Sequence, residues 1–277
     1  MLLAVDVGNT NIKFGLFADS GASAGTLAHT WRTVTNRRQT GDELAALVDG
    51  MLRIRGVEAA SIGRVVVANV VPQLYRAVTG MAQRYFNCRA EFISAARQTL
   101  MPVRTQRPAE LGADIIANAI AGVKKYGAPL IVVGFGTATT FSGVDADGAF
   151  VGAAIAPGIE ISVDALVGRA AKLMSVPLVR PRAALGTDTA SALQSGIIFG
   201  FVGQAEHLIA KIAAELGGRP TVVATGGLAE LVANNTKAIH HVDERLSLDG
   251  LYHWAMTDRK ALPEPASDGA PVIGGHE

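Results

Sequence analysis

Short apolar runs alternate with segments of helical periodicity along the chain. The runs at 2–7, 13–17 and 65–70 contain few polar residues and are typical of buried strands. Over 42–53 and 115–126, apolar residues recur at intervals of three and four, which predicts amphipathic helices. Strand and helix patterns mixed in this way predict an α/β protein.

The rest of the chain continues this alternation. Its periodicity predicts helices at 72–84 and 189–215, and strands at 130–133, 150–156 and 222–224.

The start of the chain is similar to a segment near its middle. Residues 2–10 and 130–138 are both an apolar strand that runs into a turn with Gly and a hydroxyl group, and a second strand follows each. Such turns between β-rich runs predict hairpins, and a repeat of this kind predicts two similar halves facing each other across a cleft. We therefore expect an N-terminal lobe over 1–115, a C-terminal lobe over 116–258 and a flexible tail over 259–277.

Length and charge narrow the class of protein. The 277 residues are enough for two domains that each bury a core. The 25 Lys and Arg residues nearly balance the 24 Asp and Glu residues, and no basic cluster occurs, so we expect no nucleic-acid partner.

The same composition leads us to expect a cytoplasmic protein without a membrane partner. The longest apolar stretch is shorter than the roughly 20 residues of a membrane span. Asp6 interrupts the apolar N-terminal run after five residues, which is not typical of a signal peptide. A lone cysteine, Cys88, is typical of a reducing compartment.

Asp6 is the first candidate for chemistry, because a carboxylate inside a buried strand costs several kcal/mol unless it is paired or binds a metal. Donors for a phosphate chain follow it in the turn: Gly8, Asn9, Thr10, Asn11 and Lys13. This set suits polyphosphate, with Asp6 holding Mg²⁺ directly or through water. A hairpin in which Asp6 caps the turn by accepting from its N–H groups explains the same residues.

Two further segments carry candidate residues. The turn around Thr137 is rich in threonine and could bind phosphate, although an ordinary Thr-rich hairpin has the same composition. Asp114 lies between the two predicted halves, where a carboxylate can face a cleft. Its alternative role is the N-cap of the helix predicted at 115–126. Ala117 stands where a capping box needs Glu or Gln, so no capping box supports this alternative.

These motifs, in this order, resemble the type III pantothenate kinase family of the superfamily that includes acetate and sugar kinases, Hsp70 and actin. The segments that carry the resemblance are 6–13, 135–140, 152–159, 170–173, 187–189, 194–196, 224–228 and 242–251. The resemblance implies two ribonuclease H-like lobes, each a mixed sheet flanked by helices, with an ATP cleft between them.

The resemblance also implies a reaction, which is the ATP-dependent phosphorylation of pantothenate to 4'-phosphopantothenate, the first step of coenzyme A biosynthesis. Asp114 would be the proton acceptor. The ATP-binding positions would be Asp6, Val7, Gly8, Asn9, Thr10, Asn11, Ile12, Lys13 and Thr137. The acceptor site would be lined by Gly112, Ala113, Asp114, Ile115 and Thr189. Family members are homodimers, and the partner subunit completes this acceptor site.

Three positions depart from the family pattern. Ile115 stands where the family usually has Arg, which removes a cationic fork for polar substrate groups. Thr105 replaces a Tyr that usually lines the acceptor site. Gly134 stands where an Asp usually contributes to a site for K⁺ or NH₄⁺, and glycine has no side chain to bind that cation.

These departures leave two alternatives beside the kinase. One is a diverged paralogue that binds nucleotide without catalysis, or that serves as a subunit beside an active homologue. The other is a kinase for another small hydroxylated acceptor.

Overall fold

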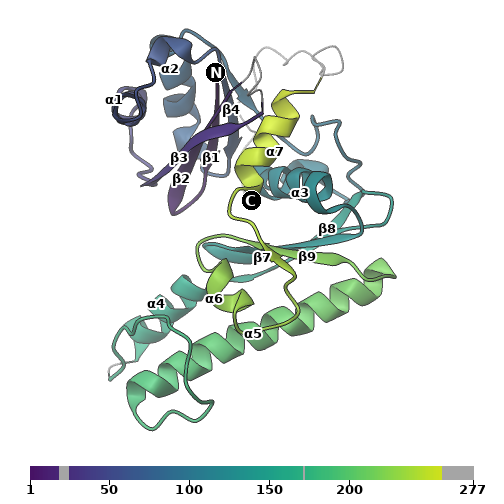
Figure 1. Cartoon of the computed structure of the whole chain (residues 1–277). Coiled ribbons are helices and arrows are strands. Elements are labelled where there is room, and N and C mark those ends of the chain that lie inside the picture. The colour runs from purple at the N-terminus through teal and green to yellow at the C-terminus, as the bar shows by residue number, and fades with distance from the viewer. Residues whose placement is uncertain (19–24, 171, 258–277) are drawn as a thin grey trace, which may run out of the picture.

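Two five-stranded mixed sheets form the frame of the protein, in a computed structural model that describes residues 1–18, 25–170 and 172–257 (Figure 1). The first sheet contains, in order across it, β3 (Leu27–Val34), β2 (Asn11–Phe17), β1 (Leu2–Val7), β4 (Arg64–Asn69) and β5 (Ala90–Phe92). The second contains β8 (Phe150–Pro157), β7 (Ala138–Val144), β6 (Leu130–Phe135), β9 (Thr221–Thr225) and β10 (His241–Val242). The tail expected over 259–277 lies outside the described residues.

The two sheets have the same topology. In the first, β1, β2 and β3 form an antiparallel meander, and β4 and β5 extend it in parallel from β1. In the second, β6, β7 and β8 form the meander, and β9 and β10 extend it in the same way. The predicted repeat and the predicted two-lobed α/β fold are therefore confirmed.

Helices separate and cover these sheets. The helices are α1 (Gly41–Ile54), α2 (Tyr75–Tyr85), α3 (Ala113–Tyr126), α4 (Ile159–Arg169), α5 (Thr189–Leu216), α6 (Ala229–Ala233) and α7 (Leu246–Ala255). Short 3₁₀ turns lie at Ala59–Ser61, Pro72–Leu74 and Pro108–Glu110.

The core is built in layers. Helices α1 and α2 bury their apolar faces on one side of the first sheet, and α4, α5 and α6 cover the far side of the second. Helices α3 and α7 lie between the two sheets, where one apolar cluster joins residues of both (Figure 1). This central layer fixes the two lobes against each other. The expected boundary between the lobes at residues 115 and 116 stays a prediction.

The small residues of α3 serve contacts inside the chain. Its alanines Ala117, Ala119 and Ala121 are buried in the central cluster. A Cβ atom at Gly250 of α7 would lie only 3.0 Å from Ala117 Cα and closer still to its carbonyl carbon and oxygen, so the two backbones touch. The small-residue composition of α3 is therefore that of a core helix and gives no evidence for a contact between subunits.

Some elements have no clear pattern in the sequence. Strand β3 alternates half-buried and exposed residues along a polar segment, and Trp31 stacks on Phe14 with ring centroids 5.6 Å apart. Helix α7 is buried along most of its length, so its sequence lacks the polar face by which amphipathic helices are recognised. Helix α5 is long and apolar enough to cross a membrane by length and composition, a test that core helices of soluble proteins also pass.

Candidate functional site

Asp6 lies near the end of β1, with its carboxylate buried beside two polar side chains of other elements. Lys13 is its direct partner across the β1–β2 hairpin, and Ser247 of α7 approaches it from the central layer. Burial raises the pKa of Asp6, whereas the charge of Lys13 and the hydroxyl of Ser247 lower it. The effect of burial on the pKa is the largest of the three, so a bound cation would stabilise the ionised form of this carboxyl group.

The turn after Asp6 is fixed by its own hydrogen bonds. The Gly8 N–H donates to Asn11 O at 3.1 Å, and the Thr35 hydroxyl donates to Gly8 O at 2.6 Å. The Gly8 N–H is therefore used inside the turn, which corrects the expectation that it is available to phosphate. Among the hydrogen bonds of the described residues, none runs from a turn N–H to Asp6, so the turn-capping alternative is not supported.

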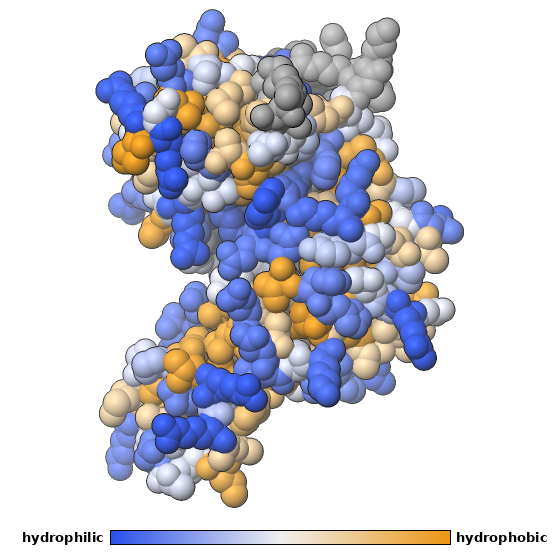
Figure 2. Space-filling model, in the orientation of Figure 1, coloured by the Kyte–Doolittle hydropathy of each residue, from blue (hydrophilic) through white to orange (hydrophobic). Residues whose placement is uncertain are grey.

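The two phosphate-type turns meet across the space between the lobes. The hydroxyls of Thr10 and Thr137 are 2.7 Å apart and hydrogen-bonded. The Gly158 N–H donates to Thr137 O at 3.1 Å, and a Cβ at Gly158 would overlap that oxygen. Glycine is required there because the backbones approach so closely. Figure 2 shows the molecule hollowed on one side between the lobe of the first sheet and the part that carries α4 and α5.

Asp114 lies in the first turn of α3, which begins at Ala113 rather than at the expected residue 115. The N-cap is Gly112, so the alternative in which Asp114 is the N-cap of this helix is wrong. The Ile115 N–H donates to Asp114 Oδ1 at 2.9 Å. A Cβ at Gly112 would lie 2.7 Å from that same oxygen, so glycine leaves room for the carboxylate.

Asp114 and Asp6 are close enough to affect each other electrostatically. Burial, and then the charge of Asp6, raise the pKa of Asp114 to about 6, while the Ile115 N–H and Lys13 oppose the rise. A carboxyl with a pKa of about 6 is largely deprotonated at neutral pH and can still accept a proton readily. The structure thus brings together Asp6, Lys13 and Asp114, which are far apart in the sequence.

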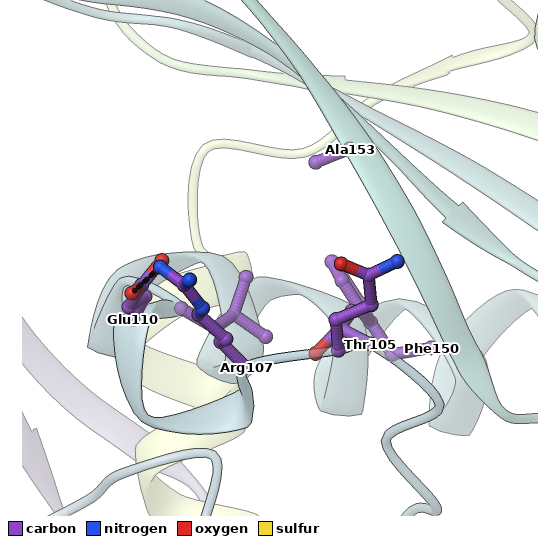
Figure 3. Close-up of a pocket in the computed structure, with 7 residues that line it drawn as sticks. Thr105, Arg107, Glu110, Phe150 and Ala153 are labelled. Carbon is purple, nitrogen blue, oxygen red and sulfur yellow. Dashed lines mark hydrogen bonds and ion pairs between the residues drawn. The ribbon is translucent and has the colours of Figure 1, made fainter.

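A pocket of about 350 Å³ opens just before α3 (Figure 3). It is lined by Thr105, Gln106, Arg107, Glu110, Leu111, Phe150 and Ala153. The segment before α3 forms one wall, and β8 of the second sheet forms the other. Because this segment leads directly into the first turn of α3, the pocket lies next to Asp114 along the chain.

Comparisons with known proteins agree with this arrangement. A family model described as type III pantothenate kinase matches residues 2–211. Proteins named type III pantothenate kinase from Brevibacillus brevis and from Moorella thermoacetica are each 44% identical over 251 residues. That alignment covers 91% of this chain in both cases, and 96% and 97% of the respective relatives. The chain belongs to the type III pantothenate kinase family.

The kinase activity and substrate expected from the sequence are confirmed at the level of this family. Among solved structures, the ethanolamine utilization protein EutJ from Carboxydothermus hydrogenoformans is 12% identical, with a TM-score of 0.55 over 91% of this chain and 89% of that one. At that identity the likeness concerns the fold alone.

Two positions that depart from the pantothenate kinase pattern have structural explanations here. Ile115 is half-buried and packs against the apolar cluster of the central layer, and it is not among the residues that line the pocket. At Gly134, an added Cβ would lie 2.7 Å from Thr140 Oγ1, so Thr140 would have to move to admit an aspartate.

Thr189 is not joined to Asp114 by any described contact. It is exposed at the first residue of α5, a helix that covers the far side of the second sheet, whereas α3 lies on the opposite side (Figure 1). Thr105 lines the pocket before α3. The sequence reading missed Ser247 beside Asp6, and Gln106, Arg107 and Glu110 in the pocket, because no local pattern marks them.

Proposed function

We propose that this chain transfers the terminal phosphoryl group of ATP to the primary hydroxyl of pantothenate, with Asp114 as the proton acceptor. The observation that carries the proposal is the approach of Asp114 to the Asp6 and Lys13 hairpin, which sets a proton acceptor beside a phosphate-type turn. Family membership supports the choice of pantothenate.

The chemistry needs few groups from the protein. The hydroxyl oxygen of the acceptor forms a bond to the γ-phosphorus, the bond from that phosphorus to the bridging oxygen breaks, and ADP leaves. The hydroxyl proton passes to Asp114. A loose transition state depends mainly on positioning and charge neutralisation, so Lys13 and the hydroxyls of Thr10 and Thr137 orient the phosphates.

Mg²⁺ fits this site, and a side-chain-bound monovalent cation does not. The buried Asp6 carboxylate offers the hard oxygen that Mg²⁺ prefers, and phosphate oxygens and water complete its usual shell. When bound, Mg²⁺ would neutralise charge on the phosphates. Position 134 offers no side-chain oxygen for K⁺ or NH₄⁺, because it is glycine.

The first prediction is ATP- and pantothenate-dependent release of ADP that is independent of K⁺. Turnover should change less than about twofold when K⁺ is replaced by tetramethylammonium at constant ionic strength, because Gly134 has no side-chain carboxylate to bind the ion. A coupled ADP-release assay measures this. ADP release only with a different small alcohol would identify another acceptor. ATP binding without turnover on any acceptor would identify a non-catalytic paralogue.

We also infer that the chain acts as a homodimer through the outer face of α5. That face carries exposed small and apolar residues at helical spacing: Ala192, Gly196, Phe199, Gly200 and Gly203. Exposed Met174 and Leu185 lie in the segment that leads into α5. Because Thr189 does not reach Asp114 within one chain, its predicted place in the acceptor site needs a second copy. The lone Cys88 supports a cytoplasmic location for this dimer.

A charged side chain on this face is expected to separate the subunits. A Cβ at Gly200 meets no described atom within 4 Å in the single chain, so Gly200→Arg fits the monomer and clashes only with a partner. Light scattering should give two 28.7-kDa chains for the wild type and one for Gly200→Arg. Gly50→Arg on α1 is the matched control, because Gly50 is also helical and open. A monomeric wild type across micromolar concentrations would refute the dimer.

A further inference from the structure

The pocket before α3 contains one basic side chain among its lining residues. Arg107 is that residue, and the rest of the lining is uncharged except for Glu110. In Figure 3, Arg107 and Glu110 lie together at one side of the pocket, with Thr105 and Phe150 at the other. Among the described lining residues, Arg107 is therefore the one cationic side chain that an anionic ligand in this pocket could pair with.

The acceptor of the proposed reaction carries a carboxylate, and an arginine side chain can pair with a carboxylate through charge-assisted hydrogen bonds. The family position for an arginine is Ile115, whose half-buried side chain packs against the apolar cluster. Lys13 lies beside Asp6 and Asp114, where the proposed reaction places the phosphates of ATP. Arg104 is held by Asp145 at 2.7 Å and by Asp147 at 3.1 Å, and it does not line the pocket.

The backbone at Arg107 is held by a turn, and its side chain is 77% exposed and paired with Glu110 at one end. Arg107 is the N-cap of the 3₁₀ turn Pro108–Glu110, and the Glu110 N–H donates to Arg107 O at 3.1 Å. One terminal nitrogen of the guanidinium donates to Glu110 Oε1 at 3.0 Å. A guanidinium has five N–H donors in a planar fork, so this contact leaves donors for a second carboxylate.

We propose that Arg107 binds the carboxylate of the acceptor and takes over the role of the arginine that Ile115 has replaced. The inference rests on the proposed function, since it assumes an acceptor that carries a carboxylate. Glu110 holds the guanidinium at the pocket and is also its competitor for the incoming carboxylate.

The test compares pantothenate with pantothenyl alcohol, which keeps the reacting hydroxyl and replaces the carboxylate by a neutral alcohol. In Arg107→Gln, the KM for pantothenate should rise about fivefold, because a charge-assisted pair at an exposed side chain is lost. The KM for pantothenyl alcohol should change less than about twofold, and kcat should be retained with both. In Glu110→Gln, the KM for pantothenate should fall.

Arg104→Gln is the matched control, as it removes a nearby exposed arginine that does not line the pocket. Equal changes of KM for both acceptors in Arg107→Gln, or no change for either, would overturn the role of Arg107. If the wild type does not turn over either acceptor, the proposed function fails, and calorimetry with pantothenate decides the inference separately. Weaker binding by Arg107→Gln than by Arg104→Gln would support it, and equal binding or no binding by the wild type would overturn it.

Discussion

Asp114→Asn is expected to lower turnover by about 10²-fold or more, within the range for the loss of a general base. The asparagine keeps an oxygen that can accept from the Ile115 N–H, so the first turn of α3 should be preserved. It cannot take the proton of the acceptor hydroxyl. Single-turnover measurements of the chemical step, together with ATP affinity from calorimetry, would separate lost catalysis from lost binding. A variant with nearly full turnover would exclude Asp114 as the proton acceptor.

The pKa of Asp114 gives this prediction a pH signature. Because the deprotonated form accepts the proton, kcat/KM of the wild type should fall about tenfold per pH unit below the pKa of about 6. This limb should be absent from the residual activity of Asp114→Asn.

The same pKa also predicts a gain in stability for Asp114→Asn. The ordinary pKa is 3.8 and the folded value is about 6, so the folded state binds the proton more tightly. The ionised group therefore lowers the free energy of unfolding progressively as pH rises from about 4 to 6, and fully above 6. Thermal unfolding should show Asp114→Asn stabilised by about 1–3 kcal/mol at pH 8 and unchanged at pH 4. If Asp114 served only the structure, its replacement by Asn would not raise the free energy of unfolding at pH 8.

Asp6→Asn is expected to weaken Mg²⁺-dependent ATP binding by about 10- to 100-fold, because it removes a charge-assisted contact in a buried position. Burial raises the pKa of Asp6, so a neutral asparagine should be tolerated by the fold. Calorimetric titration with ATP, with and without Mg²⁺, measures the effect.

Asp147→Asn, in an exposed hairpin turn, is the control for this experiment. Equal ATP affinity of Asp6→Asn and the wild type in the presence of Mg²⁺ would contradict the proposal that Asp6 binds Mg²⁺ at the phosphates of ATP. A second readout follows from the coupling of the two carboxylates. Without the charge of Asp6, the pKa of Asp114 should fall, and the acid limb of kcat/KM should move to lower pH.

The secondary structure was predictable wherever an element has one apolar and one polar side, or is apolar throughout a short run. Strands β1, β4 and β6 and helices α1 and α3 are of these kinds. Strand β3 is polar and at the edge of its sheet, and α7 is buried on most sides, so neither has the periodicity that local patterns reveal.

The sequence by itself determined the repeat and the two hairpin turns, because these depend on short runs of neighbouring residues. Its resemblance to the family supplied the proposed phosphate and proton-acceptor residues. Only the tertiary structure decided how they act together. It placed Asp114 beside Asp6, which raises its pKa, and it left Thr189 on the opposite side of the second sheet. It also packed the half-buried Ile115 against the central cluster and set Arg107 at the pocket. Burial, charge coupling and the pocket wall all arise between segments distant in the chain, so no local pattern could have revealed them.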